Sequence, residues 1–436
     1  IAKLRRSIAP CETPRLCVSA VKKSVVSTTN VISATAVAFA VASQALLAQP
    51  GSPTQTRIVG YYLAGTARNG FPVSSVKAEF LTHLNYAFAN ISADGRAILG
   101  NPCLDIGSCE GEKNPHAKPG GNFAELRRLK QRHPQLRTLI SIGGWTWSTY
   151  FSDVAATRAA RRRFVESVIT TFFREHQGVF DGIDLDWEFP VSGGLEGNRH
   201  RPADRQNYTE LVADFRHALD QLGRARNQRY LLTIGVSGGL DQIANLEVPA
   251  LARRLDFINV IAYDYHSDGK LAHFNAPLDA AERDPTPSST VRATIDAYLA
   301  AGAPANKLVL GVPFYGHGYA AVDSVRNGLF QLVNASASSG GASPNPWVGA
   351  IRYYRIPQAM RSGFVRYWEP RAGVPWLYNA RTRTWITYDD VQSIGLKSDF
   401  ARARGLGGIM IWELSGDDGT LLPVIHQKLN RKSSPR

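Results

Sequence analysis

The chain has 436 residues, of which 44% are hydrophobic, so it can bury a large core and its length alone permits two or three domains. The formal net charge is +14, but six of the 50 basic and one of the 36 acidic residues fall within the first 48 positions, which leaves +9. The other bases are scattered or sit beside apolar helix positions, as at 161–163, which indicates solvated helix faces and argues against a nucleic-acid footprint.

The amino-terminal segment has the pattern of an export signal. Lys22 and Lys23 precede a mostly apolar, charge-free stretch at 31–48. We therefore expect residues 1–48 to be an export segment, followed by a short linker at 49–56. Candidate cleavage points are the small residues Ala42, Ala45 and Ala48.

A membrane-spanning helix is the competing interpretation of this segment, because the uncharged run at 24–49 is long enough to cross a bilayer. Its polar opening and its many small residues make it a poor anchor, which favours cleavage. We expect a secreted, monomeric protein, extracellular or periplasmic, with no stable membrane anchor. The chain does not begin with Met, and no structure is predicted for its first twenty residues.

Two of the four cysteines, Cys11 and Cys17, would be lost with the export segment. Cys103 and Cys109 remain close together in the chain, and in an exported protein they predict a local disulfide that holds a loop. A metal site at this pair is disfavoured because no further Cys or His cluster supplies the other ligands. We expect no metal and no cofactor.

Beyond the linker, short apolar runs rich in β-branched residues alternate with longer helical patterns. The pattern predicts eight strands, at 57–62, 81–88, 137–144, 179–189, 230–236, 257–264, 308–313 and 407–412. Helical patterns lie between them, at 123–132, 156–176, 204–223, 246–254 and 288–301.

This alternation predicts a closed (β/α)8 barrel with helices outside, a TIM barrel of the α/β class, in a catalytic domain at 57–430 with a basic tail at 431–436. An open doubly wound sheet is the alternative, but no Gly-rich phosphate loop follows the first strand.

The interval between the seventh and eighth strands is far longer than one helix needs. Its first part is rich in Gly, Ser and Ala, and its later part is aromatic and strand-like. We interpret 320–387 as a small inserted α+β module, with a helix at 389–404 returning to the last strand. An insertion that follows a strand leaves from the carboxyl end of the barrel, so this module should form a wall on the active-site side.

Three acids end the fourth strand with a spacing of two. Asp184, Asp186 and Glu188 therefore point to one face, while the residues between them are apolar. A solvated acidic strand face is the ordinary explanation of such spacing, but the apolar flanks Phe180 and Phe189 indicate burial. Crowded buried carboxyls share protons, so the outermost, Glu188, is the candidate general acid.

The carboxyl ends of other predicted strands carry further polar and aromatic groups, which should lie around the same opening of the barrel as the three acids. Gly143 and Gly144 permit close backbone approach, and Tyr263 with Asp264 adds a phenol and a carboxylate. Each aromatic residue alone is more often part of a core than of a site, but convergence at one mouth suits a sugar polymer whose apolar ring faces stack on aromatic planes. The aromatic candidates are Tyr61, Phe88, Trp145 and Trp412.

With these motifs, the chain resembles glycoside hydrolase family 18, the chitinases. The segment 181–188 reproduces the Asp-x-x-Asp-x-Asp-x-Glu signature of that family. The resemblance runs in order from 57 to about 420. The other matching segments are Ser141-x-Gly143-Gly144, Tyr263-Asp264, Pro313-Phe314-Tyr315-Gly316, Tyr388-Asp389-Asp390 with Ser393 and Lys397, and Trp412.

The resemblance implies substrate-assisted hydrolysis of β-1,4-linked N-acetylglucosamine with retention of configuration. In that scheme Glu188 protonates the glycosidic oxygen, the 2-acetamido oxygen of the substrate attacks the anomeric carbon, and Asp186 orients the acetamido group. Asp184 exchanges a proton with Asp186, and Tyr263 hydrogen-bonds the acetamido oxygen. The residues expected to bind substrate are Tyr61, Phe88, Gly143, Gly144, Trp145, Asp264, Tyr315 and Trp412.

The chain departs from the common family pattern at Phe189, Ile261 and His317, and it lacks a tryptophan shortly after Tyr263. None of these positions is the acid or one of its two aspartates. They bear on preferred chain length and on the strength of individual sugar subsites.

Two other functions remain open at this stage. A chitin-binding lectin of the same fold would typically lack the terminal acid, which is present here as Glu188. An endo-β-N-acetylglucosaminidase on other glycans could share the acidic motif, although the inserted module fits a linear chitin chain better.

Overall fold

The computed structural model describes residues 56–109, 119–333 and 345–431. Eight parallel strands close into a barrel in the order β1-β14-β8-β7-β6-β5-β4-β2, and β1 pairs with β2 to complete the ring. The predicted TIM barrel is therefore confirmed. The barrel strands are β1 (Arg57–Leu63), β2 (His83–Ile91), β4 (Arg137–Gly143), β5 (Gly182–Asp186), β6 (Leu231–Ser237), β7 (Phe257–Ile261), β8 (Leu308–Pro313) and β14 (Gly408–Trp412).

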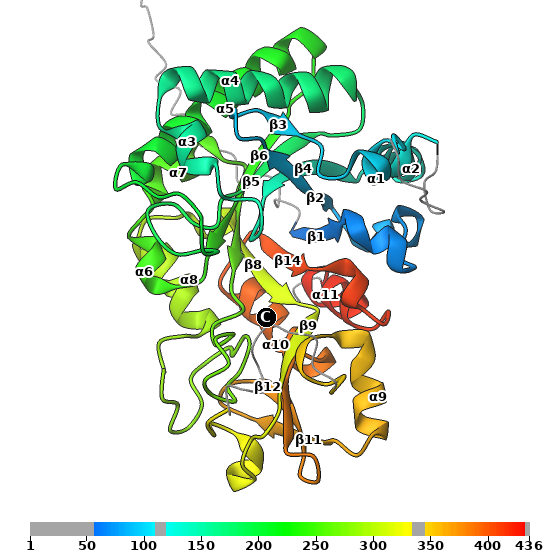
Figure 1. Cartoon of the computed structure of the whole chain (residues 1–436), viewed down its shortest axis with the longest axis vertical. Helices are drawn as coiled ribbons and strands as arrows, with labels where there is room; N and C mark the ends of the chain where they lie inside the picture. The colour runs from blue at the N-terminus through cyan, green and yellow to red at the C-terminus, as the bar shows by residue number, and fades with distance from the viewer. Residues whose placement is uncertain (1–55, 110–118, 334–344, 432–436) are drawn as a thin grey trace, which may run out of the picture. The chain divides into compact units, whose positions relative to one another are not determined.

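Helices connect successive strands and surround the barrel (Figure 1). The longer ones are α2 (Gly121–Arg132), α4 (Arg158–Val168) with its π-helical continuation η4 (Ile169–Glu175), α5 (Asp204–Arg226), α7 (Val248–Arg254), α8 (Val291–Ala300), α10 (Val391–Ala403) and α11 (Leu421–Leu429). Shorter ones are α1 (Pro102–Asp105), α3 (Phe151–Ala155) and α6 (Leu240–Ile243).

The strands form a barrel because both of their faces are apolar. In β8 every residue is buried, and in β5 every residue is buried as well, although two of its five are aspartates. Helices cover the outside of the barrel, as where Trp187, the residue after β5, stacks on Phe151 of α3 with ring centroids 5.3 Å apart. A carboxylate in a strand buried on both faces is costly unless other groups compensate its charge, so the two aspartates of β5 single out this end of the barrel.

The second sheet lies between β8 and β14 in sequence and has the order β10-β9-β13-β12-β11 (Figure 1). Its strands are antiparallel, and its own apolar cluster includes the buried rings of Trp376 and Trp385. It begins with β9 at Tyr315, five residues before the start that the sequence pattern predicts. Its elements are β9 (Tyr315–Tyr319), β10 (Gly349–Arg352), α9 (Ile356–Arg361), β11 (Val365–Glu369), β12 (Val374–Asn379) and β13 (Thr384–Thr387).

Several elements are shorter than their sequence patterns. The fourth barrel strand ends at Asp186, so Glu188 lies two residues beyond it, and β7 ends at Ile261. A short antiparallel strand, β3 (Ala97–Ile98), pairs with β2. The predicted disulfide joins Cys103, within α1, to Cys109, with their Cα atoms 4.4 Å apart. The predicted export segment and most of the predicted basic tail lie outside the described residues.

Candidate active site

The innermost carboxylate of the barrel mouth is Asp184, which is fully buried. Four side chains from four other strands donate hydrogen bonds to it: Tyr61 at 2.6 Å, Ser141 at 2.8 Å, Thr233 at 2.6 Å and Asn259 at 3.2 Å. Burial raises the pKa of Asp184, and these donors act in the opposite direction because they stabilise the charged form. Each carboxylate oxygen of Asp184 therefore accepts two hydrogen bonds, which fix the orientation of the side chain.

Asp186, one step outward on β5, is also buried, but its Oδ1 has no hydrogen-bond partner among the described residues. Gly235 on β6 makes room for it, since a Cβ there would lie 2.3 Å from that oxygen. Burial first, then the charges of Glu188 and Asp184, raise the pKa of Asp186 well above its ordinary value. A buried oxygen without a partner is costly, so Asp186 is suited to meet a donor from a ligand.

Glu188 is the outermost acid, and two polar side chains hold its backbone. Its N–H donates to Ser148 Oγ at 2.9 Å, and its carbonyl accepts from Asn198 Nδ2 at 2.9 Å. Burial first, then the charge of Asp264, raise the pKa of the Glu188 carboxyl to about 8. Glu188 is therefore protonated at neutral pH while it lines an open cavity, as a general acid requires.

Two glycines at the end of β4 shape the site without lining its cavities. Gly143 and Gly144 have φ values of +103° and +73°, and Gly144 N–H donates to the Asp186 carbonyl at 2.7 Å. A Cβ on Gly144 would lie 2.6 Å from the Phe88 ring. The glycines thus let the backbone turn against β5 and let Phe88 approach, in keeping with the predicted close backbone approach, while their binding of substrate stays a prediction.

Aromatic rings surround a cavity of about 310 Å³ above Asp186 and Glu188. Trp412 stacks on Phe88 with ring centroids 5.6 Å apart, and Tyr61 meets the Trp412 ring edge-on at 5.4 Å. The lining residues are Tyr61, Leu63, Phe88, Trp145, Thr146, Asp186, Glu188, Ile261, Tyr263, Asp264, Met410 and Trp412.

The residues after β7 complete the mouth. Tyr263 is buried and lines the cavity, and burial followed by the nearby acids raises its pKa well above the ordinary value, so its hydroxyl keeps its proton. Tyr315 was expected to bind substrate, but its hydroxyl donates to Asp264 Oδ2 at 2.6 Å and it is not among the residues that line either cavity of the mouth. Its hydroxyl is therefore paired with Asp264, and its role in substrate binding stays a prediction.

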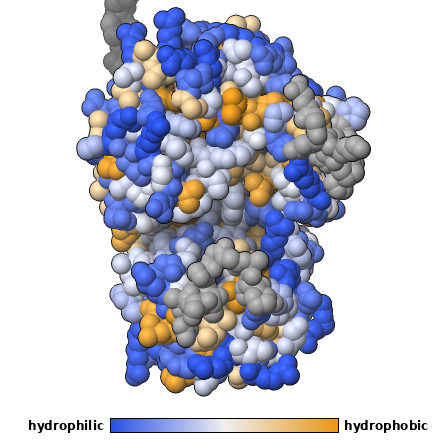
Figure 2. Space-filling model, in the orientation of Figure 1, coloured by the Kyte–Doolittle hydropathy of each residue, from blue (hydrophilic) through white to orange (hydrophobic). Residues whose placement is uncertain are grey.

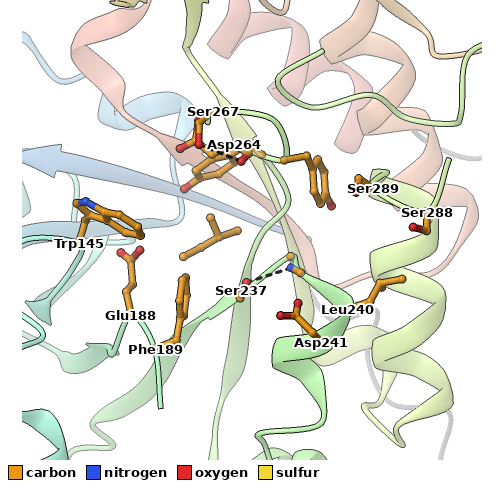
Figure 3. A pocket seen from close by; sticks show the side chains of 15 residues that line it. Trp145, Glu188, Phe189, Ser237, Leu240, Asp241, Asp264, Ser267, Ser288 and Ser289 are labelled. Carbon is orange, nitrogen blue, oxygen red and sulfur yellow. Dashed lines mark hydrogen bonds between the residues drawn. The ribbon is translucent and has the colours of Figure 1, made fainter. Parts of the chain in front are cut away.

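A larger cavity of about 710 Å³ adjoins the first one and shares Trp145, Glu188, Ile261, Tyr263 and Asp264 with it. In Figure 3, Glu188 and Trp145 lie together at one side of this cavity, while Ser288 and Ser289 lie at the opposite side. Glu188 therefore stands at the junction of two connected spaces. Such a position suits an acid that cleaves a bond between two sugars.

Sequence reasoning did not identify Thr233 and Asn259 as site residues, nor Ser148 and Asn198 as supports of Glu188. Thr233 and Asn259 leave a detectable signal, because each is an isolated polar residue in an apolar strand. Ser148 and Asn198 lie on loops, where polar residues are ordinary, and nothing in the sequence distinguishes them.

Within the described residues, no group of three or more His, Cys, Asp or Glu side chains could hold a metal ion. In the same part of the chain, no helix is both long and apolar enough to span a membrane. On the face drawn in Figure 2, hydrophilic residues predominate and hydrophobic ones occur as separate patches.

Comparisons with known proteins agree with this geometry. The sequence model of "Glycosyl hydrolases family 18" matches residues 57–417. The chain is 40% identical over 403 residues to "Chitinase A1" of Niallia circulans, and the match covers 83% of this chain and 56% of that protein. It is 36% identical over 306 residues to "Chitotriosidase-1" of Mus musculus, covering 68% of this chain and 62% of that protein.

Among solved structures, "Chitinase ChiA74 from Bacillus thuringiensis" superposes with a TM-score of 0.78 at 34% identity. That match covers 87% of this chain and 71% of the other. The chain thus spans less than two thirds of the length of the two curated relatives named above.

Proposed function

This chain belongs to family 18 of the glycosyl hydrolases, and we propose that it is a chitinase that hydrolyses β-1,4 linkages between N-acetylglucosamine units. The observation that carries the proposal is the difference in surroundings among the three acids Asp184, Asp186 and Glu188. Asp184 has four donors, Asp186 has an oxygen without a described partner, and Glu188 holds a proton beside an open cavity.

Glu188 is the proposed general acid. With a pKa raised to about 8, it can give its proton to the glycosidic oxygen at neutral pH. Its position at the junction of the two cavities supports a scissile bond there, with the reacting sugar in the smaller space and the leaving chain in the larger one.

No second enzyme carboxylate is proposed as the nucleophile. Asp186 instead would accept the N–H of the substrate's 2-acetamido group, which then attacks the anomeric carbon through its own oxygen. The unpaired Oδ1 of Asp186 supports this role because it supplies a buried acceptor that the described residues leave unused. Tyr263, which keeps its proton, would donate to the acetamido oxygen and hold it in line.

Aromatic planes would bind the sugar rings on both sides of the bond. Trp412, stacked on Phe88 and edged by Tyr61, would be the floor under the reacting sugar. Trp145, whose surface is 48% exposed, is free to carry a ring of the leaving chain.

Two measurements test this proposal. Defined oligomers of N-acetylglucosamine should be cleaved with initial release of the β-anomer, seen by proton NMR, while the same oligomers without acetyl groups should resist cleavage. A thiazoline mimic of the cyclic intermediate should inhibit. Cleavage of the deacetylated oligomers at a similar rate, or insensitivity to the thiazoline, would contradict substrate assistance.

The same assays separate the alternatives. A chitin-binding lectin would retain oligomers without cleaving them. An endo-β-N-acetylglucosaminidase would release glycans from an N-linked glycoprotein faster than it cleaves the linear oligomer.

We also propose that the chain is exported and acts as a monomer. The apolar run after Lys22 and Lys23 supports export, and so does the Cys103–Cys109 disulfide, since disulfides persist in oxidising compartments. Amino-terminal sequencing of the protein recovered from the medium tests export, and light scattering tests the oligomeric state.

A further inference from the structure

The larger cavity at the barrel mouth carries charges opposite in sign to the net charge of the chain. The sequence has 50 basic and 36 acidic residues. Among the described residues that line this cavity, however, three are acids and none is a Lys, Arg or His. The three acids are Glu188, Asp241 and Asp264. A concave surface lined by charges of one sign attracts ligands of the other sign, which here means cations.

Asp241 is the acid of this cavity whose charge is available to a ligand. Glu188 is protonated at neutral pH, because burial and the charge of Asp264 raise its pKa to about 8. Asp264 is already paired, since its Oδ2 accepts the Tyr315 hydroxyl at 2.6 Å and its Oδ1 lies 2.7 Å from His317 Nε2. Asp241 is exposed, and no hydrogen bond or ion pair within the described part of the chain uses its carboxylate.

Asp241 reaches the cavity from the start of α6, at the end opposite Trp145. It is the second residue of α6, which begins shortly after the end of β6. A Cβ on Gly239 would lie 2.9 Å from Asp241 Oδ1, so the carboxylate lies over this glycine. In Figure 3, Asp241 lies on the side of the cavity away from Trp145 and Glu188. A sugar chain that leaves Glu188 along this cavity must therefore extend beyond Trp145 to meet Asp241.

The other lining groups of this cavity are those that bind sugars. Trp145 is 48% exposed and offers a flat plane, and Leu240 is 40% exposed beside Asp241. Four serine hydroxyls line the same space and can exchange hydrogen bonds with sugar hydroxyls. These serines are Ser237, Ser267, Ser288 and Ser289. A sugar unit that lies past Trp145 would therefore find hydroxyl partners, an apolar contact and the carboxylate of Asp241.

The 2-substituent of the sugar determines which unit suits that carboxylate. An acetamido group carries no charge and offers a single N–H donor. A free 2-amino group is protonated in slightly acid solution, so it carries a positive charge. Hydrogen bonds between charged partners are roughly twice as strong as those between neutral ones. The reacting sugar must keep its acetamido group under the proposed mechanism, so a free amine is compatible with cleavage on the leaving side.

We propose that Asp241 is a specificity-determining residue that binds the ammonium group of a glucosamine unit in the leaving chain, so that partly deacetylated chitin is cleaved in preference to fully acetylated chitin. This inference deepens the function proposed above and rests on it for the position of the scissile bond. The favoured sequence has an acetylated unit at the reacting position and a glucosamine unit beyond the ring that Trp145 carries.

Two tetramers of defined sequence test the preference. Both begin with two acetylated units at the non-reducing end, and they end either in two further acetylated units or in two glucosamine units. Cleavage between the second and third units, identified by mass spectrometry of the products, should be faster for the tetramer that contains glucosamine. We expect a ratio of kcat/KM values of roughly 2–5 at low salt. The ratio should fall toward about 1 at high ionic strength, because salt screens an exposed ion pair.

Two substitutions of Asp241 separate its charge from its shape. Asp241→Asn keeps the shape of the side chain and removes the charge, so the ratio should fall to about 1 at low salt as well. Asp241→Lys places a like charge near the ammonium group and should bring the ratio below about 1. Asp268→Asn is the matched control, because Asp268 is exposed, pairs with Lys270 and lines neither cavity. That variant should keep the ratio of the parent protein.

A ratio of about 1 in the parent protein overturns the inference, and so does an equal ratio in the parent protein and Asp241→Asn. Calorimetric binding of both tetramers to Glu188→Gln, with and without Asp241→Asn, makes the same comparison without turnover. If the parent protein cleaves neither tetramer while binding still shows the preference that depends on Asp241, the proposed function fails and the binding role of Asp241 stands. Thermal melting followed by circular dichroism checks that each variant folds.

Discussion

Asp389 and Asp186 are both buried aspartates, but they lie in different regions and only Asp389 faces a cation. At the start of α10, Asp389 Oδ1 lies 2.5 Å from Lys397 Nζ, and both side chains are at most 1% exposed. At the barrel mouth, Asp186 has Asp184 and Glu188 as its charged neighbours. Each carboxylate has one oxygen without a hydrogen-bond partner among the described residues, Asp389 Oδ2 and Asp186 Oδ1. The two therefore differ in charge, because Lys397 compensates Asp389 while the neighbours of Asp186 are acids.

The difference teaches how to tell a structural acid from a functional one. Burial raises the pKa of Asp389 and lowers that of Lys397, while their attraction opposes both changes. At Asp186, burial and like charges act in the same direction. A buried acid whose charged neighbours raise its pKa further, as at Asp186, is a candidate for a functional role.

The largest expected effect follows removal of the transferable proton. Glu188→Gln should lower kcat by roughly 10²–10⁴-fold, because general acid catalysis contributes about that much, while binding of an N-acetylglucosamine oligomer persists. Turnover assays and calorimetric titration measure the two quantities. The exposed Glu196→Gln is a matched control that should change neither. Retention of more than a few per cent of the parent activity by Glu188→Gln would contradict the proposal that Glu188 is the general acid.

The comparison itself is tested by the same substitution in the two regions. Asp186→Asn should lower kcat by about 10²-fold and leave the unfolding free energy unchanged or higher. Asp389→Asn should leave kcat unchanged and lower the unfolding free energy by about 3–5 kcal/mol, because it strands a buried Lys397 charge. Urea unfolding and oligomer hydrolysis are measured on both. If both variants lose mainly stability, the distinction drawn here is wrong.

A smaller effect is expected at the exposed ring of the larger cavity. Trp145→Ala should raise KM for long oligomers by roughly 10-fold, with little change for the shortest cleavable one, because a stacking plane is worth about 0.5–1.5 kcal/mol beyond its buried area. Trp368→Ala on β11 is the control, since Trp368 contacts Arg366 and lines neither cavity. Equal KM changes in the two variants would place Trp145 outside the binding path.

The last prediction concerns the pH dependence of the unfolding free energy, which changes gradually over several pH units. The pKa of Glu188 rises from 4.5 to about 8 on folding, so between these values the folded chain binds a proton that the unfolded chain releases. The stabilising contribution of this proton is complete below pH 4.5 and is lost as the pH rises through 8. Glu188→Gln should flatten that decline by at most about 1.4 kcal/mol per pH unit, measured by urea unfolding at several pH values. Parallel stability curves for the two proteins would contradict the raised pKa.

Much of the fold was predictable because its signals are local. Eight apolar runs separated by helical patterns predicted the barrel, since a strand buried on both faces must be apolar along its length. The start of the inserted sheet was less predictable. Tyr315 to Tyr319 reads as a continuation of β8, and only pairing with β10 and β13 assigns it to the second sheet.

At the site, the alternating acids at 184, 186 and 188 and the resemblance to a known family identified the reaction centre from sequence. The different environments of those acids were not predictable. Thr233 and Asn259 lie 49 and 75 residues from Asp184 in the chain, and only closure of the barrel brings them to it.

By itself, then, the sequence determined the strand pattern, the column of acids and the family, because each is written in residues close together along the chain. Only the tertiary structure decided that Asp184 has hydrogen-bond donors, that Asp186 has an oxygen without a described partner, and that Glu188 has a raised pKa. Those properties depend on burial and on charges contributed by distant strands, and His317 reaches Asp264 only across 53 residues of intervening chain.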